Sequence, residues 1–426
     1  MAEPVAPNWQ PMPVYLLATL DTKGHEAVFV RERLVALGVE TKIVDTGCVG
    51  TPAVAADITR EEVFAAAGTS LSTMLDLNDR GRAVTAAAEG AARLIREHHA
   101  LGRVSSVLGL GGSAGTTIGT AAMRGLPLGV PKLMVSTLAS GQVRQYVGDK
   151  DILMLNSVVD ILGLNRISRT VLAEAAAAMA GMVTAAANAN AMHDDKPLVA
   201  ATMFGVTTPC VERARAVLTD AGYEVLVFHA TGTGGQAMES LVAEGLISGV
   251  LDITTTELAD ELVGGVLSAG RDRLSAAGHD AVPQVISVGA TDMVNFHAPE
   301  TVPEQFRGRT FYRHNPTVTL MRTTVEENAR LGEELGHKAA AATGPTAILL
   351  PRRGVSAIDR EGQPFDDPAA RQALFDAIRR TAGSVEVIEL DCHINDSEFA
   401  VAAAEKLLAL MNQSIQNAKC KMQNQP

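Results

Sequence analysis

The stretch SSVLGLGGSAGTTIGTAAM, residues 105–123, decides the fold of this chain. Its apolar start, 106–110, predicts a buried strand, its glycines predict a tight turn, and the residues after them predict a helix. A strand, a glycine turn and a helix form the repeating unit of doubly wound α/β domains. The same arrangement leaves free N–H groups at the start of the helix, where they attract an anion.

The same alternation of strand-like and helix-like runs continues along the whole chain. The first half opens with the strand-like VYLLATL, 14–20, and the helical EAVFVRERLVALG, 26–38. The polar NANAMHDDKP, 188–197, is typical of a linker, and LVAATMF, 198–204, restarts the pattern. We therefore predict two doubly wound Rossmann-like α/β domains, residues 1–195 and 196–426, with largely parallel sheets and a cleft between them.

Composition excludes several classes of protein. A net charge of -12 argues against a general nucleic-acid binder, because phosphate backbones are held by clustered Lys and Arg. The four cysteines form no CxxC pair, which favours a reduced, cytoplasmic protein without structural zinc. Two uncharged stretches, 104–123 and 175–192, are rich in glycine or alanine, so we predict no membrane span.

Two glycine loops match the pattern G-x-G-x-x-A after a strand and before a helix. The first contains Gly109, Gly111 and Ala114, and the second, in ATGTGGQAMESL, contains Gly232, Gly234 and Ala237. Two such loops predict at least one phosphate site, and the lack of any Gly-Lys pair excludes a Walker A loop. The predicted nucleotide-binding residues are Gly111, Gly112, Ser113, Gly115 and Thr116 in the first loop and Gly232, Thr233, Gly234, Gly235 and Gln236 in the second.

Another polar group follows the first strand. Thr19, Asp21, Thr22 and Lys23 stand where α/β folds place active sites, so Lys23 is predicted to meet a phosphate and Asp21 a Mg²⁺ ion. The alternative interpretation is an Asx turn that leads into a helix cap. A dinucleotide site is a further alternative for the second half, because Asp252 ends a strand about 18 residues beyond Gly234.

The richest polar segment runs from GATDMVNFHAPE to RHNPTVTLMRTTVEEN. Two histidines near arginines suit binding of an anionic substrate and proton transfer to it. Their spacing is not that of a helical zinc motif, so no metal site is predicted, and Cys48 is interpreted as a packing residue. The predicted catalytic residues are Asp292, His297, His314 and Glu326, and the predicted substrate-binding residues are Asn295, Arg313, Asn315, Arg322 and Arg352.

Several motifs together resemble one family. TLDTKGHE, GLGGSAGT, LNRISR, TMFGVTTPCV, FHATGTGGQAME, DITTTELADEL and HINDSEFA look like a family of largely uncharacterised microbial proteins. Its plant members include the N-terminal ATP-binding domain of the tomato mosaic virus resistance protein. The resemblance covers residues 12 to 410 and implies two Rossmann-like subdomains that bind ATP. The plant protein continues into a barrel-like region, so a joint activity here would need that barrel as a separate partner protein.

Three functional hypotheses follow. The first is a cytoplasmic ATP-binding enzyme, with Mg²⁺ as a candidate cofactor, that acts on an anionic small molecule. The second is a non-catalytic, nucleotide-gated module that binds another protein, and the third is an NAD-dependent oxidoreductase centred on the second loop. The sequence is compatible with a homo-oligomer, and it predicts neither nucleic acid nor membrane as a partner.

Overall fold

The computed structural model describes residues 12–141, 143–189 and 196–423, with side chains as far as 187 in the first half and 416 in the second. The chain divides by contacts into two units, 1–193 and 194–426. The predicted boundary after residue 195 falls on 190–195, which lie outside the described residues.

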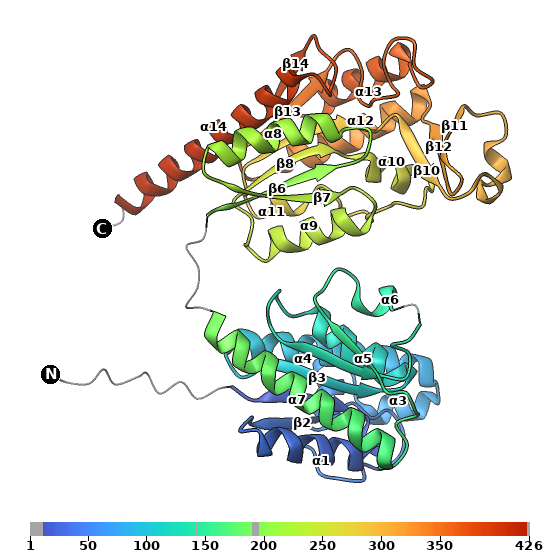
Figure 1. Cartoon of the computed structure of the whole chain (residues 1–426), viewed down its shortest axis with the longest axis vertical. Helices are drawn as coiled ribbons and strands as arrows, with labels where there is room; N and C mark the ends of the chain where they lie inside the picture. The colour runs from blue at the N-terminus through green and yellow to red at the C-terminus, as the bar shows by residue number, and fades with distance from the viewer. Residues whose placement is uncertain (1–11, 142, 190–195, 424–426) are drawn as a thin grey trace. The chain divides into compact units, whose positions relative to one another are not determined.

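The first unit is built on one five-stranded parallel sheet in the order β2-β1-β3-β4-β5 (Figure 1). Its strands are β1 (Val14–Ala18), β2 (Thr41–Asp45), β3 (Ser106–Gly111), β4 (Lys132–Ser136) and β5 (Leu153–Asn156). Its helices are α1 (Leu20–Ala36), α2 (Arg60–Ala66), α3 (Leu71–Leu77), α4 (Arg80–Ala100), α5 (Ser113–Arg124), α6 (Arg144–Val147) and α7 (Arg166–Ala189).

Helices cover both faces of this sheet because its strands are apolar on both sides. One face packs against α1 and α7, with Val30 and Met179 fully buried. The other packs against α2, α4 and α5, with Phe64 and Ile118 fully buried. A parallel sheet buried on both faces is the doubly wound arrangement, which confirms the predicted fold class for this unit.

Helix α7 is long and apolar enough to cross a membrane by length and composition alone; among the described residues it is the one helix that passes this test. Its residues Leu172, Ala175, Ala176 and Met179 are buried in the core against the sheet. A core helix of a globular domain has this packing, and its alanines let it lie close to α1.

The second unit has a six-stranded parallel sheet in the order β14-β13-β9-β8-β6-β7. The strands are β6 (Leu198–Met203), β7 (Glu224–His229), β8 (Gly249–Thr254), β9 (Gln284–Gly289), β13 (Thr346–Pro351) and β14 (Glu386–Leu390). The helices are α8 (Thr208–Asp220), α9 (Thr233–Ala243), α10 (Thr256–Val263), α11 (Ala276–His279), α12 (Val325–Ala340), α13 (Pro368–Thr381) and α14 (Ser397–Gln423), with 3-10 turns η1 (Pro299–Thr301) and η2 (Glu304–Phe306).

Helices again cover both faces of the sheet. Helices α8 and α14 bury one face, and α10, α12 and α13 contribute to the core on the other. The second unit is therefore also doubly wound, as predicted.

A small antiparallel sheet accompanies the second unit and is not expected from the sequence. It contains β10 (Met293–Phe296), β12 (Val318–Arg322) and β11 (Phe311–Asn315), in that order. The central strand β12 is largely buried, whereas the edge strand β11 is mostly exposed. This difference decides where the polar residues of the segment lie.

Candidate functional site

The strand order of the first unit places a crevice between β1 and β3. The chain leaves β1 toward β2 on one side, and β3 lies on the other side, so the loops after β1 and β3 diverge. A cavity of about 260 Å³ lies there. Its lining combines the two polar groups predicted from the sequence: Thr19, Asp21, Thr22 and Lys23 after β1, and Gly112, Ser113 and Gly115 after β3.

The start of α5 supplies unpaired donors to this cavity. Gly112 is the N-cap residue and offers no side-chain cap, and the first hydrogen bond of the helix runs from the Thr116 N–H to the Gly112 carbonyl. The N–H groups of Ser113, Ala114 and Gly115 have no acceptor among the residues that the structure describes. Such N–H groups carry the positive end of the helix dipole, so this wall of the cavity attracts an anion.

Close packing of the chain explains two of the glycines in this loop but not the third. A Cβ atom on Gly111 would lie 2.5 Å from the carbonyl carbon of Gly115, and one on Gly115 would lie 3.0 Å from the Leu110 oxygen. These two allow the strand and the helix to pack closely. A Cβ on Gly112 would meet only the Thr137 hydroxyl, at 3.7 Å. The chain itself therefore does not require glycine at 112, whereas a ligand that approaches the backbone there would.

The residues after β1 form the first turn of α1, which begins at Leu20, well before the predicted 26. The helix is kinked at Lys23, whose φ is −131°, and the Lys23 ammonium donates a hydrogen bond to the Ile161 carbonyl at 3.0 Å. Asp21 accepts from the Val49 N–H with one carboxylate oxygen, at 3.3 Å. The other oxygen, Oδ1, is buried without a partner among the described residues. An unpaired buried carboxylate oxygen suits a cation brought in by a ligand.

The surroundings of Cys48 and Thr116 indicate that both residues stabilise the fold. Burial raises the pKa of the Cys48 thiol to about 11, and Asp21 adds to the effect, so the thiol stays protonated at neutral pH. This agrees with its interpretation as a packing residue. Thr116 is buried, and its hydroxyl shares a 2.6 Å hydrogen bond with the Ser136 hydroxyl. Of the first loop, Gly112, Ser113, Ala114 and Gly115 therefore face the cavity, while Gly111 and Thr116 hold the turn.

The second glycine loop already holds an anion from its own chain. The N–H groups of Gly232 and Gly235 both donate to Oε1 of Glu257, at 2.7 and 3.1 Å. A Cβ on Gly235 would lie 2.3 Å from that carboxylate, and one on Gly234 would lie 1.9 Å from the His229 oxygen. The donors predicted for a nucleotide phosphate are thus used internally. The five predicted residues 232–236 do form the start of α9, but the anion that their N–H groups bind is the carboxylate of Glu257.

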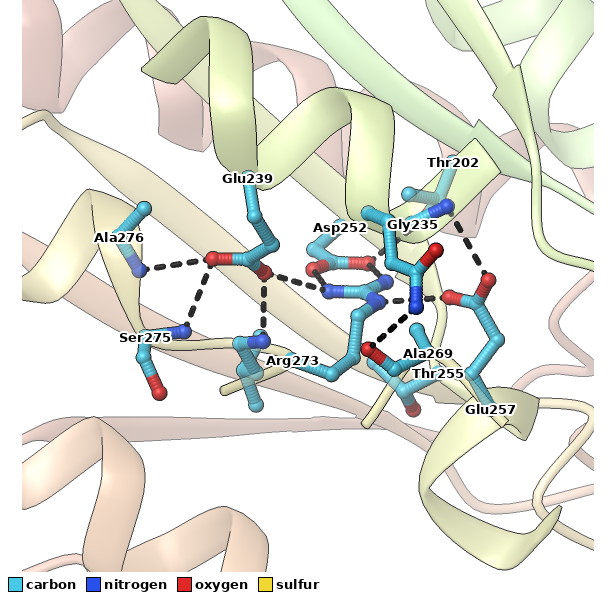
Figure 2. Close-up of polar contacts among 12 residues, drawn as sticks. Thr202, Gly235, Glu239, Asp252, Thr255, Glu257, Ala269, Arg273, Ser275 and Ala276 are labelled. Atoms are coloured by element: carbon cyan, nitrogen blue, oxygen red, sulfur yellow. Dashed lines mark hydrogen bonds and ion pairs between the residues drawn. The ribbon is translucent and has the colours of Figure 1, made fainter. Parts of the chain in front are cut away.

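Arg273 sits at the centre of a buried ionic network beneath this loop (Figure 2). Its guanidinium is fully buried and contacts three carboxylates, those of Glu239, Asp252 and Glu257. The contact with Asp252 is bidentate, with Nη1–Oδ2 and Nη2–Oδ1 distances of 2.5 and 2.7 Å. Both Asp252 oxygens are therefore occupied and inaccessible, which argues against its predicted role at an NAD ribose.

The predicted polar segment of the second unit separates into buried and exposed parts. Asp292, Asn295 and Arg322 are buried. The remaining predicted residues of this unit are exposed: His297, Arg313, His314, Asn315, Glu326 and Arg352. Among the described residues, neither His297 nor His314 hydrogen-bonds to the predicted catalytic acids. The density of polar residues in the sequence therefore does not correspond to a single site.

The buried part belongs to a cluster that the sequence did not reveal. Asp292 accepts a 2.8 Å hydrogen bond from the Ser356 hydroxyl, and burial, reinforced by nearby Asp359, raises the pKa of Asp292 to about 7. Asp359 is paired with Arg371 at 2.7 Å and with Arg322 at 3.4 Å. Ser356, Asp359 and Arg371 lie 64 to 79 positions after Asp292, and no local motif joins them. Among the described residues, no group of three or more His, Cys, Asp or Glu side chains is arranged to hold a metal ion.

Asp260 gives a prediction for the pH dependence of stability. Its carboxylate accepts from the side-chain N–H of Asn295 at 2.6 Å, yet burial dominates and raises its pKa to about 7. In the unfolded chain an Asp titrates near pH 4, so the folded state holds more protons between about pH 4 and 7. The free energy of unfolding of the second unit should therefore fall as pH rises through this window, by up to about 3 kcal/mol from pH 5 to 8.

Replacing Asp260 with asparagine should flatten this dependence. The Asn295 side chain can turn to accept from the new amide, because its own oxygen lacks a partner among the described residues. Urea unfolding at pH 5 and pH 8 measures the difference, and Asp272→Asn is the matched control because Asp272 is exposed. An equal slope in Asp260→Asn and in the parent protein would assign the pH dependence to other groups.

Both halves of the chain match one protein family. The N-terminal domain of an uncharacterised protein family, UPF0261, matches residues 12–188, and the C-terminal domain of the same family matches residues 196–411. A UPF0261 protein of Clostridium tetani is 48% identical over 400 residues, which cover 93% of this chain and 98% of that protein. A UPF0261 protein of Rhizobium meliloti is 50% identical, over 92% of this chain and 97% of that protein.

A plant relative is also similar. The tomato (Solanum lycopersicum) ToMV resistance protein Tm-1(GCR237) is 46% identical over 317 residues, which cover 73% of this chain but only 42% of the tomato protein. Among solved structures, MurG of Acinetobacter baumannii aligns at 12% identity over 93% of this chain and all of that one, with a TM-score of 0.22. The fold assignment therefore rests on the strand order and not on that alignment.

Proposed function

The chain belongs to the uncharacterised protein family UPF0261, and on that premise we propose that its first unit binds ATP in the cavity between β1 and β3. One observation carries the proposal: the uncapped N-terminus of α5 and the polar residues of α1 line the same cavity. This cavity stands at the reversal of strand order, where open α/β sheets bind their ligands. The resemblance to the tomato resistance protein, which implies ATP binding, points to the same ligand.

The cavity offers a set of groups suited to a polyphosphate. The N–H groups of residues 113–115 would donate hydrogen bonds to phosphate oxygens, and Gly112 leaves space for these oxygens to approach. Lys23 and Arg80 line the same cavity and add positive charge. The Arg80 side chain has no acceptor among the described residues, so it is available to a ligand.

Magnesium fits the same site. Asp21 holds a buried carboxylate oxygen without a partner in the described part of the chain. Mg²⁺ in nucleotide sites is commonly held by one or two carboxylates together with phosphate oxygens. Asp21 would be its protein ligand, and the ion would neutralise the charge of the phosphates. The chain's own contribution is to position that carboxylate at the kinked start of α1, with one of its oxygens buried.

Beyond binding, we propose a cytoplasmic small-molecule enzyme that acts on an anionic substrate. The arginine-lined cavity at the carboxyl ends of β13 and β14 favours such an enzyme over a non-catalytic module that binds nucleotide and another protein. Turnover separates the two, because a module binds nucleotide without consuming it. A joint activity with a separate barrel-type protein remains part of the proposal. We do not retain the second glycine loop as a nucleotide site, because Glu257 fills it.

Arg80 provides a test with a matched control. Titration calorimetry of the full chain with ATP, with and without Mg²⁺, should show saturable binding at one site. Arg80→Ala should weaken it at least about tenfold, because a hydrogen bond to a charged group contributes about 1.5–3 kcal/mol. Arg82→Ala removes an exposed arginine two residues further along α4, outside the cavity, and should leave the affinity unchanged.

Two outcomes of this titration would contradict the proposal. Folded protein that binds no ATP would refute the proposal and leave the glycines as turn residues. ATP that binds tightly but is insensitive to Arg80 would place the nucleotide elsewhere. NAD is titrated in parallel, and tighter binding of NAD than of ATP would favour the oxidoreductase hypothesis.

A further inference from the structure

A second cavity lies in the second unit, at the carboxyl ends of β13 and β14. It has a volume of about 750 Å³, and four arginines border it: Arg352, Arg353, Arg360 and Arg371. Arg352 and Arg353 follow β13 directly, while His393 and Asp396 follow β14. The carboxyl ends of parallel strands are where doubly wound folds bind ligands, so the location itself suits a site.

The four arginines differ in their partners. Arg371 is neutralised by Asp359 and Asp366, and Arg353 by the exposed Asp391 in a bidentate pair. The side chains of Arg352 and Arg360, both exposed, have no acceptor among the described residues. The N–H groups of two guanidinium groups on one cavity are therefore free to donate to an anion.

The acidic side chains around the cavity do not cancel this capacity. Asp366 is engaged with Arg371, and Asp396 accepts a 2.8 Å hydrogen bond from the His393 N–H. Asp396 keeps its negative charge despite that hydrogen bond, and Glu361 has no hydrogen-bond or ion-pair partner in the described chain, so both carboxylates oppose the free arginines. Four arginines face three carboxylates among the residues that line the cavity, so the charge of the lining is positive by one.

The backbone at Arg352 and Arg353 is held by hydrogen bonds to the chain that follows β14. The N–H of Arg352 bonds to the Leu390 carbonyl at 2.9 Å, and that of Arg353 to the Cys392 carbonyl at 3.0 Å, so the pairing of β13 with β14 continues past both strand ends. Gly354, with φ of +136°, brings the chain so close that a Cβ there would lie 2.7 Å from the His393 ring. Positions fixed in this way reduce the entropy lost when a ligand is bound.

His393 forms a neutral part of this floor. Its Nε2 donates to the Ser356 carbonyl at 2.8 Å, and its Nδ1 accepts from the Asn395 N–H at 3.1 Å. Both ring nitrogens are therefore used in holding the loops together. Burial also lowers the pKa of His393, so the cavity's positive charge comes from the arginines.

We propose that this cavity binds a small polyanion, with two or more anionic oxygens, through Arg352 and Arg360. A phosphate monoester and a dicarboxylate share this chemistry, because both offer pairs of oxygens that match the guanidinium fork. This site would give the anionic substrate of the proposed function a location, so the inference rests on that proposed function. Its lining residues all belong to the second unit, whereas those of the nucleotide cavity all belong to the first.

The test uses the full chain and defined probes: inorganic phosphate and pyrophosphate in one arm, malonate and succinate in the other. Calorimetry should show saturable binding in at least one arm, weakened at least about tenfold in Arg352→Gln/Arg360→Gln. The control Arg215→Gln/Arg330→Gln removes the same charge from exposed positions on α8 and α12 and should bind as the parent does. The arm that responds identifies the ligand class.

Other outcomes overturn the proposal. Equal weakening in the control pair would mean general charge attraction, and no saturable binding to any probe would mean no site. Phosphate binding that is lost in Gly112→Val but kept in Arg352→Gln/Arg360→Gln would place it in the first unit. ATP is also titrated against every variant. Absent polyanion binding with normal ATP binding would refute this proposal alone, and absent ATP binding with normal polyanion binding would refute the nucleotide proposal alone.

Discussion

Replacing Gly112 with valine is expected to abolish nucleotide binding while the first unit stays folded. The new side chain would occupy the space in which phosphate approaches the N–H groups at the start of α5. The chain itself tolerates it, because the nearest atom to a Cβ at 112 is the Thr137 hydroxyl at 3.7 Å, and φ there is −80°. The cost to folding should be about 1 kcal/mol or less, since glycine is replaced at a helix N-cap.

Calorimetry with ATP measures the loss, which should exceed about 100-fold because several hydrogen bonds to charged phosphate fail together. Gly181→Val is the matched control: Gly181 lies on α7 of the same unit, is exposed, and has no atom within 4 Å of its Cβ position. It should bind ATP normally. Unchanged affinity in Gly112→Val would show that the ligand does not touch this helix start.

Replacing Arg273 with methionine is expected to destabilise the second unit strongly. The variant leaves Asp252, Glu257 and Glu239 beneath the glycine loop without their shared cation. Removing one partner of a buried ion pair lowers the free energy of unfolding by about 3–5 kcal/mol, because the remaining charge has no water to solvate it. The loss should be smaller at low pH, where the carboxylates take up protons.

Arg271→Met gives the comparison. Its guanidinium side chain is 94% exposed and pairs with Glu261 only at 3.8 Å, so its loss should change the free energy of unfolding by less than about 1 kcal/mol. Urea unfolding of both variants, followed by circular dichroism, measures the difference. Similar stabilities would mean that the buried carboxylates are readily neutralised without Arg273.

Much of the first site could be predicted from the sequence because its parts follow general rules. Glycines at a strand–helix junction and polar residues after the first strand each indicate a strand end. The rule that parallel strands align their carboxyl ends then predicts that such groups come together. Thr19, Asp21, Thr22 and Lys23 do line one cavity together with Gly112 to Gly115. The nucleotide itself stays a prediction.

The second unit was harder to predict for two physical reasons. Its glycine loop has the same spacing as the first, and the carboxylate that fills it comes from Glu257, 22 residues after Gly235, so no local pattern distinguishes a filled helix start from an open one. The polar segment 292–326 folds into a small sheet whose edge strand is exposed and whose central strand is buried. Neighbours in the sequence such as His314 and Arg322 therefore have opposite surroundings.

The carboxylate of Glu257 makes the second unit independent of small anions for the integrity of its glycine loop. The first unit has no such built-in occupant, so its helix start gains its full set of partners only when a ligand arrives. By mass action, a ligand that binds only the folded form adds RT ln(1 + [L]/Kd) to the stability of the unit that binds it. The two halves of one chain would then respond unequally to the supply of nucleotide: the lifetime of the first unit against proteases would rise with ATP, whereas the glycine loop of the second unit would keep its partners at any ATP concentration.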